Sequence, residues 1–234
     1  MTQATASIFD QVHQWMTAGG QVPPAERLVE ALVAAEKSRR QGGLKPAGNQ
    51  DGPSWTYADL LGQWRLSFIT GTRTSRRRAG VVLGRGRFVP RWMAISLTYG
   101  RLDKALDNID RIPPDLKAAE DRPDAQIGWV QNRVAIAAAT LMVSGPTRLW
   151  PNDILAFDFT RMRVSLGDRT LVNAAIRDGA NRESAFGQQA LKQQAFFRYF
   201  LVNQSYIAAR GRGGGLALWV REGAMGDAPP KIAR

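Results

Sequence analysis

The sequence predicts a mainly β protein, in which a closed antiparallel β-barrel follows two N-terminal α-helices. The first observation is a change in hydrophobic spacing, from a helical period before residue 41 to an alternating pattern from Trp55 on. The second is a series of short apolar segments separated by turns rich in Gly, Pro and Asp, which is typical of a barrel. A chain of 234 residues is long enough for one large domain. We therefore divide it into a helical segment with a linker (1–54), a barrel (55–222) and a tail (223–234).

The N-terminal segment contains two helical patterns. Apolar residues recur at helical spacing over 5–17, and Gly19-Gly20 ends that pattern. A second helix is expected over 24–40, with acidic residues in its early turns and basic residues near its end, as the helix dipole favours. Residues 41–54 are expected to form a linker. His13, the one histidine of the chain, lies in the first helix and has no nucleophile motif beside it, so we interpret it as solvated or packed.

The barrel is expected to begin with a strand over 62–70. Trp64, Leu66 and Phe68 alternate with polar residues there, so these three side chains are predicted to face the interior. A polar connection, in part helical, is expected over 178–194. Short strands, broken by Gly84, Gly86 and Pro90, are expected over 81–83 and 88–99. The remaining predicted strands are 154–159, 161–166, 171–176, 196–208 and 216–220.

Residues 127–143 are read as one or two strands, although periodicity alone also permits a helix here. As strands, they place Val134, Ile136, Thr140 and Met142 on one face and Ala135, Ala137 and Ala139 on the other. A row of alanines leaves space beside the sheet. We expect either a closely packed helix or a ligand to fill that space.

The composition excludes several chemistries. The chain has no cysteine, which excludes disulfides, thiolate catalysis and thiolate metal sites. With a single histidine, a histidine-rich metal centre is excluded as well. The sequence shows no apolar run long enough to cross a membrane and no secretory signal at its start. We therefore expect neither a metal nor a covalent cofactor, and a cytoplasmic or peripheral location.

The net charge of +12 is concentrated in two segments without acidic residues. Residues 60–102 hold nine arginines, and residues 184–221 hold five basic residues. Because the first and last strands of a closed barrel are neighbours, these segments are expected to form one basic docking face for phosphate groups. A basic surface that only maintains solubility is the alternative. The predicted docking residues are Arg73, Arg76, Arg77, Arg78, Arg85, Arg87, Arg91, Arg210 and Arg212.

Two motifs are typical of nucleotide or nucleic-acid binding, but we favour a structural interpretation of both. The glycine run 211–215 does not lead from a strand into a helix with Lys-Ser/Thr, so we interpret it as a hairpin turn and not as a phosphate loop. The cluster Arg76–Arg78 with Trp92 is typical of single-strand nucleic-acid binding. Most aromatic residues alternate with polar ones, however, and are expected to point inward, which disfavours a nucleic-acid partner.

The segment from Leu60 to Thr70, with Gly62 and Trp64, resembles the opening strand of the plastid-lipid-associated proteins, also called fibrillins. The same glycine and tryptophan are similar to those of lipocalins, in which the tryptophan closes the base of the barrel. The segment from Tyr206 to Glu222 is similar to the family's Arg-Gly turn and last strand. One departure is 203–205, Asn-Gln-Ser, where the family has acidic residues. The resemblance spans most of the chain, with its anchors at both ends of the barrel.

The resemblance implies a non-enzymatic, lipocalin-like barrel that binds an isoprenoid quinone, a carotenoid or a lipid at thylakoid membranes and lipid globules, here in a cyanobacterial member. A partner protein is also compatible with it. The inward aromatic and small residues predict an apolar cavity. The candidate cavity residues are Trp64, Leu66, Phe68, Ala135, Ala137, Ala139, Phe157, Phe159 and Tyr199.

Other functions remain open on the sequence. A barrel packed solid with side chains would act as a structural coat or docking protein. A bilin lyase-like enzyme would hold a tetrapyrrole in the same kind of barrel. A nucleic-acid-binding protein would use the basic segments alone.

Overall fold

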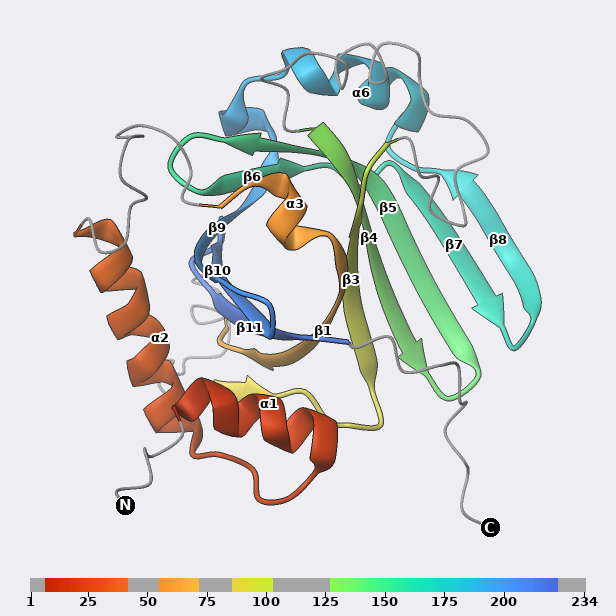
Figure 1. Ribbon diagram of the computed structural model, residues 1–234. Helices are drawn as coiled ribbons and strands as arrows, with labels where there is room; N and C mark the ends of the chain where they lie inside the picture. The colour runs from red at the N-terminus through yellow and green to blue at the C-terminus, as the bar shows by residue number, and fades with distance from the viewer. Residues whose placement is uncertain (1–6, 42–54, 72–85, 103–126, 223–234) are drawn as a thin grey trace, which may run out of the picture.

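In the computed structural model, residues 7–41, 55–71, 86–102 and 127–222 are described. Eight of their strands form a closed antiparallel barrel, in which the first strand, β1, pairs with the last, β11 (Figure 1). The predicted fold class is therefore confirmed. The barrel strands are β1 (Gly62–Ile69), β3 (Ala94–Gly100), β4 (Ile127–Ile136), β5 (Ala139–Trp150), β6 (Ile154–Phe157), β9 (Ala195–Val202), β10 (Tyr206–Gly211) and β11 (Leu216–Arg221).

The two predicted helices are present and lie outside the barrel (Figure 1). Helix α1 (Ile8–Ala18) begins at Ser7, whose hydroxyl accepts a hydrogen bond from the Asp10 amide in a capping box. It ends at Gly19, whose φ of 84° suits glycine. Helix α2 (Ala25–Arg40) follows, and both helices pack their apolar sides on the outer faces of β9, β10 and β11.

The barrel strands therefore have two apolar faces. In β11, Leu216, Leu218 and Val220 face the helices, whereas Ala217 and Trp219 face the barrel interior. This alternation is the period-2 pattern of a strand between two cores. Aromatic residues are more frequent in the inner core, where they are seven of the 16 buried residues, than in the outer core, where they are three of 11. The largest fully buried side chains of the two cores are Trp64, Tyr199, Leu60, Leu155 and Ile207 inside, and Phe68, Leu28 and Leu32 outside.

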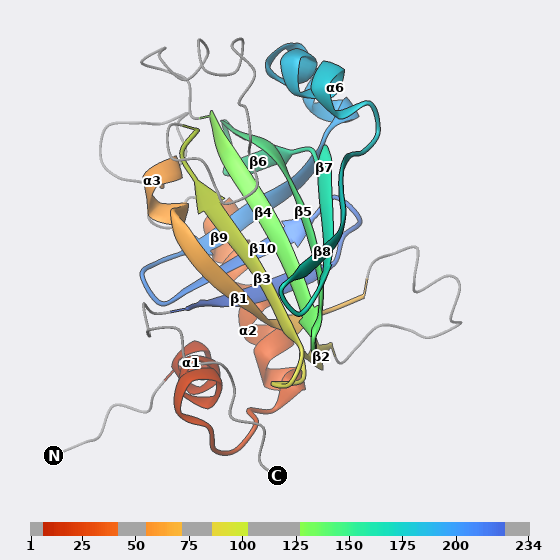
Figure 2. The same cartoon turned by 90° about the vertical axis from the view of Figure 1, so that its right-hand side faces the viewer.

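A four-stranded extension, which we call the wing, projects from the barrel on the side away from α2 (Figures 1 and 2). Strand β5 belongs to both the barrel and the wing, because residues 147–150 pair with β6 while residues 139–144 pair with β7. Strand β7 (Arg161–Leu166) then pairs with β8 (Arg169–Ala175), the last strand in the sheet order. The wing comprises residues 131–144 of β4 and β5 together with 161–175 of β7 and β8.

Short helical elements complete the described chain. The helix α3 (Tyr57–Leu60) precedes β1, and the two-residue strand β2 (Arg87–Phe88) pairs with its end. The connection from the wing to β9 contains α6 (Gly179–Ala185) and the two 3-10 turns η1 (Phe186–Gln188) and η2 (Leu191–Gln193). The expectation of a partly helical segment here is confirmed.

The interpretation of residues 127–143 as strands is confirmed, since they belong to β4 and β5. The predicted faces are wrong, because after the turn at Ala137-Ala138 Ala139 pairs with Ile136 and Thr140 pairs with Ala135. The predicted strand 196–208 is two strands, separated by a turn in which the side-chain oxygen Oδ1 of Asn203 accepts hydrogen bonds from the backbone amides of Ser205 and Tyr206. An asparagine side chain that bonds the backbone two and three residues on is a common way to make a turn. The predicted strand 81–83 lies outside the described residues.

Candidate ligand site in the barrel

One end of the barrel is closed by Trp64 and Arg221. The indole nitrogen of Trp64 donates to the carbonyl of Leu60 in α3 over 2.6 Å. The Arg221 guanidinium lies 3.9 Å from the centre of the Trp64 ring and donates to the carbonyl of Leu61 over 2.9 Å. Gly62 makes this contact possible, because it has a φ of 112° and a Cβ there would lie 2.8 Å from Arg221. The Gly-x-Trp motif and the last strand thus form one structural unit at this end.

Tyr57 reinforces the same end. Its hydroxyl lies 3.1 Å from the carbonyl oxygens of both Gly100 and Trp129, and it accepts a hydrogen bond from the Thr147 hydroxyl over 3.0 Å. A single side chain from α3 therefore connects β3, β4 and β5.

The barrel interior holds a buried tyrosine pair. The hydroxyl groups of Tyr99 and Tyr199 are 2.7 Å apart. Burial raises the pKa of both phenols above the usual value, so both are neutral at physiological pH. Trp55 packs edge-on against the Tyr199 ring at 5.4 Å, and Trp219 lies 6.3 Å from it. The interior is thus aromatic and uncharged around these two hydroxyl groups.

Two buried polar atoms of this interior lack a protein partner in the described part of the chain. They are the indole nitrogen of Trp55 and the side-chain oxygen of Asn132. Trp55 is only 7% exposed and belongs to the inner core. Asn132 pairs with Leu97 across β3 and β4, which places it on the interior face. The interior therefore contains an unmatched donor and an unmatched acceptor.

The structure brings together most of the predicted aromatic cavity residues. Trp64, Leu66, Phe157 and Tyr199 belong to the inner core, and Phe159 packs against it. Phe68 is the exception. A β-bulge between Leu66 and Phe68 shifts the alternation by one, so Phe68 is buried under the helices. The prediction that Phe68 faces the cavity is wrong.

The alanine row does not line the barrel. Ala137 lies in the hairpin turn with a φ of 50° and is exposed, and Ala139 is exposed at the start of β5. Ala135 pairs with Ala94 and lies on the face opposite to Val134, whose partner Ile95 packs on the inner core. The prediction is wrong because the turn was not recognised in a run of small residues.

Of the nine predicted docking residues, the structure describes four, and two of these four are held by other groups of the protein. Arg87 and Arg91 are exposed. Arg210 instead forms a salt bridge with the buried Glu36 of α2, and its hydrogen bond lowers the pKa of that carboxyl group. Arg212 donates to the carbonyls of Lys192 and Gln194. The docking residues Arg73, Arg76, Arg77, Arg78 and Arg85 lie outside the described residues.

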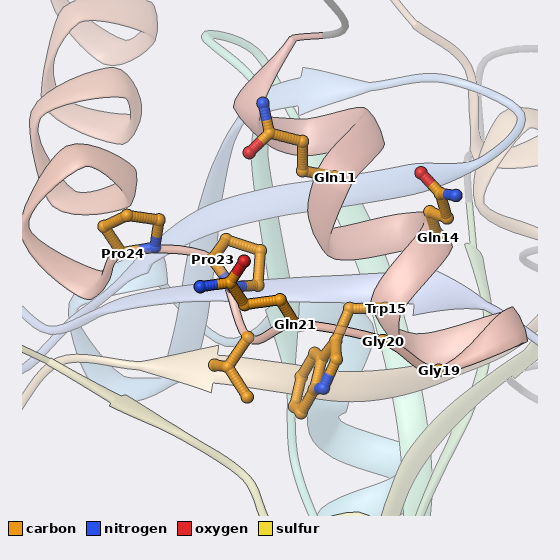
Figure 3. Close-up of a pocket in the computed structure, with 9 residues that line it drawn as sticks. Gln11, Gln14, Trp15, Gly19, Gly20, Gln21, Pro23 and Pro24 are labelled. Atoms are coloured by element: carbon orange, nitrogen blue, oxygen red, sulfur yellow. The ribbon is translucent and has the colours of Figure 1, made fainter.

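A pocket of about 360 Å³ lies outside the barrel, between α1 and the segment that leads to α2 (Figure 3). Gln11, Gln14 and Trp15 come from α1, and residues 19–24 complete the lining. The lining has no charged residue, and the Trp15 ring packs edge-on against Phe88 at 5.1 Å. The sequence analysis did not find this pocket, because its residues are read as a helix end and a turn.

Within the described ranges, no group of three or more His, Asp or Glu residues could hold a metal ion. Of the helices described, none combines the length and the apolar character needed to cross a membrane. No protein-family model matches this chain, and no curated protein matches its sequence. The fold is compatible with the lipocalins, while the finer resemblance to the fibrillins stays a prediction.

Proposed function

We propose that this protein is a non-enzymatic carrier that holds one lipophilic small molecule in its barrel and associates reversibly with an anionic membrane. The ligands are those that the resemblance implies, namely an isoprenoid quinone, a carotenoid or an acyl lipid, and the place is the thylakoid surface.

The chemistry of the barrel interior carries this proposal. Ligand sites are mostly apolar with a few placed polar groups, and the inner core supplies aromatic walls around the Tyr99–Tyr199 pair. Buried polar atoms nearly always have a partner, yet the Trp55 nitrogen and the Asn132 oxygen have none among the described residues. A ligand carbonyl, as in a quinone, would accept a hydrogen bond from the Trp55 nitrogen, and a ligand hydroxyl, as in a quinol or a protonated fatty acid, would donate one to the Asn132 oxygen.

The membrane part of the proposal rests on charge. A net charge of +12 attracts the protein to anionic lipids, to which each Lys or Arg near the surface contributes about 1 kcal/mol. Salt weakens this attraction, so the association is expected to be reversible.

A second candidate is a barrel filled by its own side chains, which would serve as a structural or docking protein. The ring contacts of Phe197 favour it, because in the inner core this side chain lies 5.0 Å from Phe157 on the neighbouring strand β6 and 5.4 Å from Trp219 on β11. Small barrels can be filled by side chains in this way.

A titration with decyl-benzoquinone, followed by tryptophan fluorescence, separates the two candidates. We expect saturable quenching, and about a tenfold weaker affinity in Trp55→Phe, because that variant keeps the ring and loses the donor. Trp92→Phe is the matched control, since Trp92 is 68% exposed and outside the inner core. If quinone, carotenoid and fatty acid all fail to bind saturably, the carrier proposal is contradicted.

A bilin added to the protein would reveal a lyase-like site by a change in the visible absorbance of the bilin.

A further inference from the structure

The wing carries an exposed apolar surface. Of the nine large apolar side chains that are exposed in the described part of the chain, five belong to the wing. They are Ile136, Leu141, Leu166, Leu171 and Val172, which are 40% to 61% exposed. Four of them lie within three residues of the two hairpin turns at 137–138 and 167–168, so the surface is concentrated at the outer end of the wing. A patch of this kind on a folded protein indicates an interaction site.

Strand register shows that the wing is amphipathic. Leu141 pairs with Val134 on one side and Val164 on the other, and Val164 pairs with Val172. Cross-strand partners project to the same face, so these four aliphatic side chains form one row. On the opposite face, Met142 of β5 pairs with Arg133 of β4 and with Arg163 of β7, so one strand lies between the two arginines.

The charges of the wing are almost all positive. Arg133, Arg163 and Arg169 make no ion pair with any acid of the described residues, and neither does Arg177 just after β8. The one acidic residue between 131 and 144 or between 161 and 177 is Asp168, in the β7–β8 turn. In contrast, Arg161 at the base of the wing is held by Glu183 of α6.

We propose that the wing is the element by which the protein contacts an anionic lipid bilayer. Amphipathic helices bind such surfaces with their apolar side at the boundary of headgroups and acyl chains and their Lys/Arg side among the phosphates. A single sheet layer is of similar thickness. On the wing, the aliphatic row lies on one face and Arg133 and Arg163 lie on the other, while Arg169 pairs with Leu166 at the outer end of the aliphatic face. The inference rests on the membrane part of the proposed function and assigns it to a surface other than the predicted docking face.

Charge complementarity favours an anionic bilayer, and not a second copy of this chain, as the partner of the wing. Strand β8 is exposed at every residue and pairs along one edge only among the described strands, so a second β8 could extend the sheet there. Such a dimer would bring together two wings that are each positively charged, and like charges at an interface are unfavourable. An anionic bilayer neutralises the same arginines.

The test is cosedimentation of the full chain with vesicles of phosphatidylcholine alone or mixed with phosphatidylglycerol. The wing variant is Leu166→Asp/Leu171→Asp, and its control is Val22→Asp/Val33→Asp, because those valines are 49% and 46% exposed and the charge change is identical. A third variant, Leu166→Ser/Leu171→Ser, removes the apolar groups without changing the charge. Decyl-benzoquinone binding and the sedimentation coefficient are measured for every variant.

We expect the wild type and the valine control to bind the anionic vesicles alike, and the aspartate wing variant to lose at least about tenfold in its partition coefficient. The serine variant is expected to lose several-fold, with quinone binding unchanged in all of them. Equal vesicle binding by the wing variants and the wild type would overturn the wing assignment alone. Absence of vesicle binding by the wild type would overturn both the wing assignment and the membrane part of the proposed function. A wild-type dimer that the wing variants abolish, without an effect on vesicle binding, would identify the wing as a self-association surface instead.

Discussion

The two sides of this molecule differ in whether the apolar side chains outside the barrel interior are buried or exposed. On one side, α1 and α2 cover the sheet with fully buried residues such as Leu28 and Leu32. Ion pairs hold α2 in place there, Glu36 with Arg210 and Arg39 with Asp153. On the wing, aliphatic side chains of the same kind are exposed, and most of the arginines have no acidic partner among the described residues. One side is therefore built for stability, and the other is available for contact with something else.

The largest expected difference between the two sides is in packing. Leu28→Ala should lower the free energy of unfolding by about 3 kcal/mol, because it leaves a cavity under a fully buried side chain. Leu171→Ala should change it by less than about 0.5 kcal/mol, because that side chain is 61% exposed. Urea unfolding of the two variants measures both values. Similar losses would mean that the wing is part of the cooperative core.

The next largest effect on the free energy of unfolding concerns the ion pair between Glu36 of α2 and Arg210 of β10. Arg210→Ala should cost about 3 kcal/mol, because it leaves the carboxylate of Glu36 buried without its main partner. Arg40→Ala removes the other, 58% exposed partner of the same carboxylate and should cost about 0.5 kcal/mol. Thermal unfolding compared between the two variants checks this order, and an inverted order would contradict the assignment of Arg210 to stability.

The same pair predicts a dependence on pH. The pKa of Glu36 is lower in the folded protein than its ordinary value of 4.5, mainly because of the hydrogen bond from Arg210. The ionised form thus stabilises the fold, fully so above pH 4.5, and this contribution is lost as the pH falls through the lowered pKa. Unfolding measured between neutral and acid pH should show a smaller loss of stability in Glu36→Gln than in the wild type. Parallel curves would contradict the coupling.

The smallest expected effect lies in the wing. Ala137 has a φ of 50°, a conformation that glycine adopts without strain. Ala137→Gly should therefore raise the free energy of unfolding by at most about 1 kcal/mol. A clear destabilisation, measured in urea, would show that the turn does not have this backbone conformation in solution.

Alternation and turn residues were sufficient to predict the fold class. The change of period near Trp55 separates the two helices from the strands, and Trp64, Phe157 and Tyr199 were correctly placed inside. Phe68 could not be placed from the sequence, since a bulge between Leu66 and Phe68 leaves no mark in the alternation. The turn at Ala137-Ala138 was missed for a similar reason, because two alanines are not a turn signal.

The candidate site was less predictable than the fold. The charge of Arg210 suggested a docking face because no acid is near it in the sequence, but its partner Glu36 is 174 residues away. Such ion pairs form between residues that are distant in the sequence. Counting charges along the chain therefore does not predict them. Trp55 was likewise missed as an interior residue, because it precedes the first predicted strand and has no alternating neighbours.

The central claim is that the barrel holds a lipophilic ligand, and its most direct test is mass spectrometry of an organic extract. The wild type and Trp55→Phe would be purified in parallel from a phototrophic host and extracted at equal protein concentration. The account predicts one quinone, carotenoid or lipid in a near-stoichiometric amount in the wild-type extract, and clearly less of it in the variant. An extract without such a compound, from protein with intact folding, would contradict the carrier function and indicate that the side chains alone fill the barrel.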